Sequence, residues 1–500
     1  MNPRLVVAPP AAPRPCILPL VPPLDPLLLT SATELARRIR AGEVRSREVV
    51  ATHVERARKV NPGLNAIVVD RFEAALAEAE AADARLAREG PADLPPLHGV
   101  PCTIKECFAL EGMPQTSGLV ARRGYLAPRD ATVVARVRAA GAIPLGVTNT
   151  SELCMWMESS NRVYGRTNNP YDAGRIVGGS SGGEGSIVGS GASPFGVGSD
   201  IGGSIRNPAF FNGVFGHKPT SALVPNSGQF PIAENAARRY LTTGPLARRA
   251  CDLMPLLRLM AGPDGQDEVC EASALGDPGS VSLRGMRVVH VPDNGFLGVS
   301  EELGRAQQRV ADHLAEQGAR VEERRFPRLK KSIEIWSAML AEAGGTAFGV
   351  LLGNGAPISA AKELARFALG RSPHTLPALA LAVMEGLVKG SPAQTARFVA
   401  EGTALRAELL DAMGPSGIML FPVYPETAPK HVWPLFPPVR WAYPAILNVM
   451  EFPATAVPLG LSSGGLPLGI QITSARHNDH ITIAVAMELE RAFGGWVPPN

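Results

Sequence analysis

Apolar residues along the chain alternate between helical spacing and short continuous runs, which is the pattern of a layered α/β protein. Residues 131–148 show this pattern most clearly. We predict a helix over Val133–Ala140, its end at Gly141, and a buried strand over Ile143–Val147. A second short buried strand is predicted over Val100–Ile104. The pattern therefore indicates a sheet with helices packed against it.

The same reasoning places most of the remaining elements. Ser31 and Glu34 match a capping box at a helix start, and Asn61-Pro62-Gly63 is typical of a helix end. Further helices are predicted over Glu34–Ala41, Ser46–Lys59, 70–89, Leu303–Gln317, Leu376–Val388 and Ile481–Phe493. Further strands are predicted over Met286–Val291, Met419–Tyr424 and Leu466–Thr473, with a proline-rich loop between the last two that reaches Pro444.

Residues 1–28 lack this pattern because prolines interrupt them throughout (Pro9, Pro10, Pro13, Pro15, Pro19, Pro22, Pro23 and Pro26). Proline breaks helices, so we expect neither a signal-peptide core nor a membrane-spanning helix there. No later stretch offers about 20 uninterrupted apolar residues. We predict an irregular N-terminal arm over 1–28 and one domain over 29–500.

Composition narrows the class of protein. The chain has 500 residues, 45% of them hydrophobic, and a formal charge of +3 from 49 basic and 46 acidic residues. This balance argues against a nucleic-acid groove or a polybasic membrane patch. The six cysteines form no C-x-x-C pair, which favours free thiols in a reducing compartment. We therefore expect a soluble cytoplasmic protein.

Glycine and serine are densest between Gly178 and Arg206, where the chain reads GGSSGGEGSIVGSGASPFGVGSDIGGSIR. Each glycine costs folding entropy, so such density is expected where the backbone takes positive φ or approaches a ligand. Within this stretch we predict a helix over Glu184–Val188 and a strand over Phe195–Gly198, with Ser204 at the next strand-to-helix corner. The N–H groups of 200–204 could converge on one point, as an oxyanion hole requires. This stretch is our candidate active site.

Lys105 directly follows the predicted strand Val100–Ile104. A surface position is one interpretation, since exposed lysines are common. The other is a buried amine, which is costly unless it is paired or its pKa falls by several units. A lysine neutralised in this way can act as a general base. Met155 and Trp156 allow a similar pair of interpretations, ordinary packing or the lining of a pocket.

Four segments together resemble the amidase signature family: GVPCTIKE, VGGSSGGEG, GVGSDIGGSIRNPAFFNGVFGHKPT and GLPLGIQI. Two others, TNTSELCMWMESSNRVYGRTNNPYD and HNDHITIAVAMELERAFGGWV, are similar to the fatty-acid amide hydrolases, particularly the type-two branch. The resemblance covers roughly residues 30–500. It implies a single amidase-signature domain with a mixed central β-sheet covered on both faces by helices. It also implies hydrolysis of carboxylic amides without a metal or other cofactor.

The resemblance also implies which residues act. Ser204 matches the nucleophile, Lys105 the base, and Ser180 the serine that follows a cis peptide bond and passes protons between them. Supporting roles fall to Ser181, Asp200 and Arg206, and substrate binding to Cys154, Met155 and Gly179. The oxyanion hole corresponds to the backbone N–H groups of Ile201, Gly202, Gly203 and Ser204.

Other functions remain open at this point. Residues 178–182 fit the G-x-S-x-G nucleophile elbow, which would make Ser180 the nucleophile and one histidine essential. His477 and His480 could serve a metal hydrolase, although Asn478 or Asp479 more simply caps a helix. A non-catalytic ligand-binding scaffold is the remaining class. Replacing each histidine, metal analysis and labelling with a serine-reactive phosphonate separate these alternatives.

The expected substrate is a lipophilic amide with a long acyl or aryl group, as in aryl acylamidases, while ureas, carbamates and esters remain open. Residues 330–410 are expected either to select it or simply to pack the core. An apolar face such as Leu376–Val388 would allow reversible, peripheral contact with a membrane. The resemblance also allows a homodimer, and no nucleic-acid partner is expected.

Overall fold

The computed structural model describes residues 24–387, 391–435 and 439–499. Within them, eleven strands form one mixed sheet in the order β1-β3-β2-β6-β8-β7-β12-β13-β11-β9-β10. Strands β3, β2 and β6 are parallel neighbours, as are β11, β9 and β10, and the other pairings are antiparallel. The strands are β1 Ile67–Asp70, β2 Pro101–Lys105, β3 Ile143–Thr148, β6 Phe195–Asp200, β7 Phe215–Lys218, β8 Thr242–Ala247, β9 Arg287–His290, β10 Arg320–Glu323, β11 Ile418–Phe421, β12 Ala454–Leu461 and β13 Pro467–Ser474.

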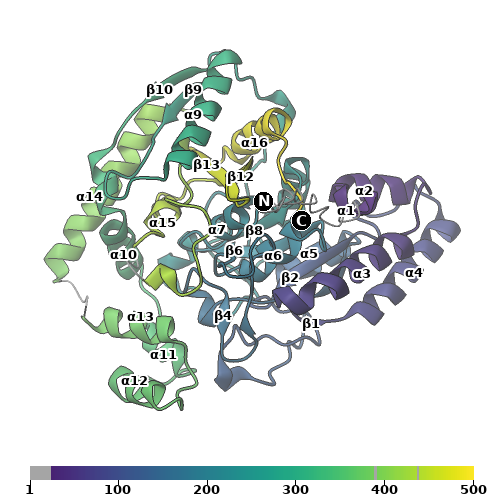
Figure 1. The fold of residues 1–500 in the computed structure, drawn as a ribbon, viewed down its shortest axis with the longest axis horizontal. Helices are drawn as coiled ribbons and strands as arrows, with labels where there is room; N and C mark the ends of the chain where they lie inside the picture. Colours follow the sequence, from purple (N-terminus) through teal and green to yellow (C-terminus); the bar gives the residue numbers. More distant parts are fainter. Residues whose placement is uncertain (1–23, 388–390, 436–438, 500) are drawn as a thin grey trace, which may run out of the picture.

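Helices cover both faces of this sheet, which confirms the predicted fold class (Figure 1). A separate two-stranded sheet joins β4 Ser160–Asn161 to β5 Gly165–Arg166. The helices are α1 Pro26–Leu29, α2 Ala32–Arg40, α3 Ser46–Leu64, α4 Phe72–Glu89, α5 Thr132–Ala139, α6 Gly182–Gly189, α7 Arg206–Phe211, α8 Leu253–Met260, α9 Glu301–Glu316, α10 Ser332–Glu342, α11 Phe348–Leu352, α12 Ala360–Ala368, α13 Leu376–Leu387, α14 Pro392–Met413, α15 Ala442–Val449 and α16 Asp479–Phe493.

The centre of the molecule is built from the glycine-rich stretch. Every residue of α6, β6 and α7 is buried. Such close packing requires small side chains: a Cβ on Gly183 would lie 2.4 Å from the backbone nitrogen of Asn149. The stretch therefore lies inside the core, where its strand β6 pairs with β2.

Most of the predicted elements are present, but several boundaries are wrong. The strand predicted over Met419–Tyr424 ends at Phe421, and α15 begins at Ala442, inside the loop that was predicted to reach Pro444. Helix α3 continues through Pro62 to Leu64, where Asn65 turns the chain with φ +51°. Pro26–Leu29 is the helix α1, although 26–28 were assigned to the irregular arm. The cap explains this correction, because Asp25 Oδ1 accepts from Leu27 N at 2.8 Å and proline is tolerated at the first helical position. Residues 1–23 of the arm lie outside the described residues.

Helices α11, α12 and α13 form a lobe at one side of the molecule, beside β4 (Figure 1). Its small apolar core combines Phe348, Leu352 and Ala378 with Leu119 and Leu153 from the main domain. None of the helices in the described segments is long and apolar enough to cross a membrane.

Candidate active site

Lys105 is fully buried at the carboxyl end of β2. Its Nζ donates to Ser180 Oγ at 2.7 Å and to Ser199 Oγ at 3.0 Å. Strands β2 and β6 run parallel, so their carboxyl ends bring Lys105 beside Ser199. The structure thus places Lys105 inside the protein, against hydroxyl partners, and excludes the surface interpretation.

Ser180 lies in the tight segment that precedes α6. The peptide bond between Gly179 and Ser180 is cis. Ser159 holds this segment in place, because its Oγ donates to the carbonyls of Gly178 at 3.1 Å and Ser180 at 3.0 Å and accepts from Gly182 N at 2.9 Å. A Cβ on Gly179 would lie 2.3 Å from the carbonyl oxygen of Trp156. The backbone therefore fixes the Ser180 hydroxyl against Lys105.

Ser204 occupies the predicted corner between β6 and α7 and is 9% exposed. Its carbonyl accepts from Ser181 N at 3.1 Å, which connects its loop directly to the Ser180 segment. Ser181 also joins this segment to β6, since its Oγ donates to Ser199 O at 3.2 Å and accepts from Ser199 N at 3.3 Å. The structure thus brings the segments of Lys105, Ser180 and Ser204 together around Ser199.

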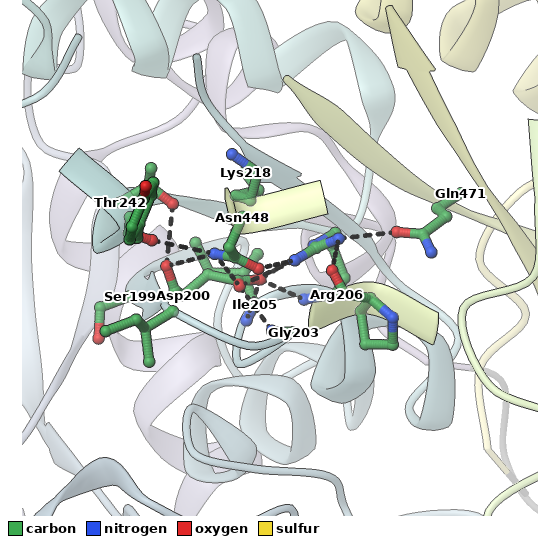
Figure 2. A network of polar contacts seen from close by, with 12 residues as sticks. Ser199, Asp200, Gly203, Ile205, Arg206, Lys218, Thr242, Asn448 and Gln471 are labelled. Atoms are coloured by element: carbon green, nitrogen blue, oxygen red, sulfur yellow. Dashed lines mark hydrogen bonds and ion pairs between the residues drawn. The ribbon is translucent and has the colours of Figure 1, made fainter. Parts of the chain in front are cut away.

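A buried ion pair shapes the loop from Asp200 to Arg206 (Figure 2). Arg206 contacts both carboxylate oxygens of Asp200, through Nε and Nη2 at 3.0 Å each. The carboxylate also accepts from Gly203 N at 2.7 Å and Ile205 N at 3.0 Å. Burial by itself would raise the pKa of Asp200, but the charge and hydrogen bonds of Arg206 hold it well below its ordinary value. Asp200 is therefore an anion at neutral pH, and the loop folds around it.

The guanidinium of Arg206 then ties this loop to distant parts of the chain. Its Nη1 donates to Pro444 O at 2.8 Å and Gln471 Oε1 at 2.9 Å, and its Nη2 donates to Asn448 Oδ1 at 2.6 Å. Trp336 Nε1 also donates to the carbonyl of Ile201 at 2.9 Å. Helices α10 and α15 and strand β13 thereby position the loop.

The four predicted oxyanion donors differ in what they contact. The N–H of Gly203 is engaged by Asp200, so it is not free in this structure. The N–H groups of Ile201, Gly202 and Ser204 have no hydrogen-bond partner among the described residues. Gly203 itself takes φ +108°, and a Cβ there would lie 2.4 Å from Pro444 Cγ. Three donors are therefore available to an oxygen beside Ser204.

The predicted substrate-binding residues line a turn after β3. Cys154 is partly exposed, and its Sγ lies 3.3 Å from Ser117 Oγ and 3.4 Å from Thr150 Oγ1. Met155 packs against the α11–α13 core, and Gly179 lies against the same turn. The turn thus connects the Ser180 segment to the lobe.

Glu152 fastens the lobe to this turn. Its carboxylate lies 2.8 Å from His374 Nδ1 and accepts from the N and Oγ1 of Thr375 at 2.8 and 2.9 Å. Neither this contact nor the roles of Ser159 and Ser199 were predicted from the sequence. Ser199 directly follows the predicted strand Phe195–Gly198, and β6 in fact continues to Asp200, so an extension of the alternation by two residues was the available signal.

The histidines considered for other mechanisms lie elsewhere. His477 Nδ1 contacts Ser273 Oγ at 3.0 Å, and the hydrogen bond to the Ser180 hydroxyl comes from Lys105 instead of a histidine. Asp479 accepts from Thr220 N at 2.8 Å and lies 3.1 Å from His217 Nε2, which makes it a structural anchor at the start of α16. Across the described ranges, no group of three or more His, Cys, Asp or Glu could hold a metal ion.

Comparison with known proteins places this geometry in a family. The amidase family model matches residues 48–483, so the chain belongs to the amidase family. Fatty-acid amide hydrolase 2 of Homo sapiens is 46% identical over 96% of this chain and 92% of that protein. Fatty-acid amide hydrolase 2-B of Danio rerio is also 46% identical, over 98% of this chain and 94% of its own length. The predicted family and its type-two branch are confirmed.

Solved structures agree with this assignment. Native peptide amidase from Stenotrophomonas maltophilia superposes with a TM-score of 0.76 at 26% identity, covering 94% of this chain and 98% of that one. The protein is therefore a hydrolase of the amidase class.

Proposed function

We propose that this amidase cleaves lipophilic carboxylic amides through an acyl-enzyme on Ser204. The observation that carries the proposal is the 2.7 Å contact between Lys105 Nζ and Ser180 Oγ, in a segment hydrogen-bonded to the Ser204 backbone. A serine hydroxyl is a weak nucleophile and needs a base, and the chain supplies one within hydrogen-bond reach of the adjoining serine.

The reaction then proceeds through two hydroxyls. Lys105 accepts a proton from Ser180, and Ser180 accepts one from Ser204 as Ser204 Oγ attacks the amide carbonyl. The N–H groups of Ile201, Gly202 and Ser204 stabilise the oxyanion, where removing one donor typically costs about 10²–10³ in rate. Ser180 returns a proton to the leaving amine, and water hydrolyses the acyl-enzyme.

Labelling of the full chain with a fluorophosphonate tests the nucleophile. We expect a covalent adduct on Ser204, no adduct in Ser204→Ala, and an unchanged circular dichroism spectrum for that variant. Ser186→Ala is the matched control, because Ser186 Oγ only donates to Asn168 O at 2.9 Å and labelling should persist. An adduct on Ser180 with Ser204 free would instead support the nucleophile-elbow alternative. A wild-type protein that is not labelled at all would support the non-catalytic ligand-binding scaffold.

The lipophilic substrate class rests on the two type-two fatty-acid amide hydrolases to which the chain is similar. Each buried methylene contributes about 0.8 kcal/mol, roughly fourfold in affinity. We therefore expect kcat/KM to rise with acyl length in a series of primary amides from acetamide to oleamide. Equal kcat/KM along the series would contradict a lipophilic acyl site. An anilide series run in parallel tests the aryl alternative.

The same proposal includes a peripheral membrane contact. The residues that would make this contact differ from the face predicted over Leu376–Val388. Ala378 and Leu379 of α13 are buried, so the predicted apolar face points partly into the protein, and Val388 lies outside the described residues. Leu369 and Leu376 are 69% and 39% exposed and would face the lipid. Flotation with liposomes should show weak binding that Leu369→Ser/Leu376→Ser abolishes. Binding that depends on residues 1–28 instead would assign the contact to the N-terminal arm.

A further inference from the structure

One peptide unit of the loop, the one that joins Ile201 to Gly202, is held from outside by a tryptophan. Trp336 lies in α10, and its Nε1 donates to the carbonyl oxygen of Ile201 at 2.9 Å. The N–H of Gly202 belongs to the same peptide unit and has no hydrogen-bond partner among the described residues. It is one of the three N–H groups that can reach an oxygen beside Ser204. The carbonyl end of this unit is therefore engaged, while its N–H end is left for a ligand.

The geometry of a peptide unit connects these two ends. The bond between Ile201 and Gly202 is trans, so its carbonyl and its N–H point in opposite directions within one plane. A donor on the carbonyl side thereby directs the N–H of Gly202 away from the indole. On the following side, the N–H of Gly203 is bound to Asp200 Oδ1 at 2.7 Å. The direction of the free N–H is thus set by Trp336 before it and by Asp200 after it.

Trp336 is itself held firmly enough to fix that direction. Only 9% of it is exposed, and it belongs to an apolar cluster that includes Ile335 and Met339. Its ring meets that of Trp441 edge to face, with centroids 4.9 Å apart and an interplanar angle of 77°. A Cβ on Gly202 would lie 3.7 Å from Trp336 Cζ2, so the ring runs alongside the peptide unit. The indole N–H is the one polar group of this side chain, and it is spent on Ile201.

We propose that Trp336 is a positioning residue of the oxyanion hole, because its indole N–H both aims and polarises the N–H of Gly202. A carbonyl that accepts a hydrogen bond draws electrons from its own amide nitrogen, and linked hydrogen bonds strengthen one another by about 10–30%. The gain is largest when the bound oxygen carries the negative charge of the tetrahedral intermediate. This inference rests on the proposed function, since it requires the substrate oxygen to bind beside Ser204.

Trp336→Phe tests the inference in the full-length enzyme, because it keeps an aromatic ring and removes the N–H. We expect kcat for oleamide to fall about tenfold, less than the roughly 10²–10³ of a deleted donor, with KM unchanged. A long-chain alkyl trifluoromethyl ketone forms a charged tetrahedral adduct with a serine, so its inhibition constant should rise by the same factor as kcat falls. The matching trifluoromethyl alcohol forms no adduct, and its inhibition constant should stay constant.

Trp496→Phe is the matched control. Trp496 Nε1 also donates to a backbone carbonyl at 2.9 Å, that of Gly189, and the residue is 3% exposed. It lies at the end of α6 that is remote from Ser180, so this variant should lower the urea midpoint but leave kcat and both inhibition constants unchanged. Equal losses of kcat in the two variants would reduce Trp336 to a packing residue. A raised KM with unchanged kcat in Trp336→Phe would make it a wall of the substrate site instead.

Polarisation of the N–H can also be measured without catalysis. Ile201–Gly202 is the only Ile-Gly pair in the sequence. Carbonyl-¹³C isoleucine and ¹⁵N glycine therefore isolate the amide signal of Gly202 in NMR spectra of the deuterated full chain. Its proton should move upfield in Trp336→Phe. It should move downfield in otherwise unchanged protein grown with 5-fluorotryptophan, whose N–H is a stronger donor of nearly the same shape.

The two kinds of measurement separate this inference from the proposed function. A Gly202 signal that stays in place in both samples, or an active wild type whose kcat is unchanged by Trp336→Phe, would overturn the role of Trp336 alone. A wild-type protein that neither hydrolyses amides nor reacts with a fluorophosphonate would overturn the proposed function, and the role in the oxyanion hole with it.

Discussion

Replacing Arg206 with methionine removes one half of the buried ion pair that holds the loop from Asp200 to Arg206. Methionine fills much of the same volume, but the Asp200 carboxylate keeps its burial and loses both contacts at 3.0 Å. Breaking a buried pair by removing one partner costs about 3–5 kcal/mol, because an uncompensated charge remains. Whole domains are stable by about 5–15 kcal/mol, so Arg206→Met should lose a large fraction of the free energy of unfolding.

The assay is urea denaturation of the wild type, Arg206→Met, Asp200→Asn and the double variant at pH 7. Each single variant should lose about 3–5 kcal/mol, and the double variant clearly less than the sum, with a coupling of about 2–3 kcal/mol. The pKa of Asp200 is lowered in the folded state, so the pair stabilises the fold above the carboxyl's ordinary pKa of 3.8. This contribution is lost as pH falls below that value, and the gap between wild type and Arg206→Met should then narrow.

Activity provides a second readout of the same variants. The pair orders the loop that carries the free N–H groups, so kcat should fall in Arg206→Met even at low temperature, where the fold persists. A loss below 1 kcal/mol, or strictly additive losses in the double variant, would refute the view that the ion pair organises this loop.

Four further outcomes follow from individual contacts. Ser199→Ala should lower kcat/KM about tenfold or more and the free energy of unfolding by about 1–3 kcal/mol, because the buried Lys105 amine loses one of its two hydroxyl partners. Gly203→Ala should lower kcat as well as stability, since a Cβ there meets Pro444 Cγ at 2.4 Å, and initial rates and urea curves will separate the two effects. Glu152→Gln should raise protease cleavage within 345–387, because it weakens the contact to His374, and unchanged cleavage would contradict that fastening role. Burial raises the pKa of Glu184 to about 8, so the wild type should lose stability as pH rises from about 4.5 to 8. Glu184→Gln cannot titrate, so its free energy of unfolding should rise relative to that of the wild type across this pH range. Urea denaturation of both proteins at pH 5 and pH 8 will measure the difference.

Local sequence signals predicted the elements that depend on nearby residues. The helix α5, the turn at Gly141 and the strand β3 follow from spacing and one glycine, and Ser31 Oγ accepts from Glu34 N at 3.1 Å as the capping box requires. The helix end at Asn61-Pro62-Gly63 was wrong because tertiary packing overrides propensity there. Leu64 packs into the main core, and Asn61 Oδ1 accepts from Ala66 N at 2.8 Å, which places the turn after the proline.

Some residues of the site could also be predicted from nearby sequence, whereas others depend on contacts between distant parts of the chain. Lys105 and Ser204 were placed from short motifs, because strand ends and glycine-rich corners leave a local signature. Asn448, Gln471 and Trp336 could not be predicted, since their relation to the loop exists only after α15, β13 and α10 have packed around it. An alternation pattern shows that such residues are buried, but not which loop they meet.

The glycines between Gly178 and Arg206 were expected to provide positive φ or close approach to a ligand, but the structure shows a further cause. Positive φ is required at Gly178 and Gly203, where the backbone turns beside the candidate serines. The glycines within α6 have helical conformations, and there the missing side chain matters: a Cβ on Gly183 or Gly185 would approach neighbouring atoms at 2.4 and 2.7 Å. Close approaches of the same kind occur outside α6 at Gly179, Gly196 and Gly198, so most of that density reflects how closely the whole stretch packs in the core. This packing fixes the segment that precedes α6, and with it Ser180, within hydrogen-bond reach of Lys105.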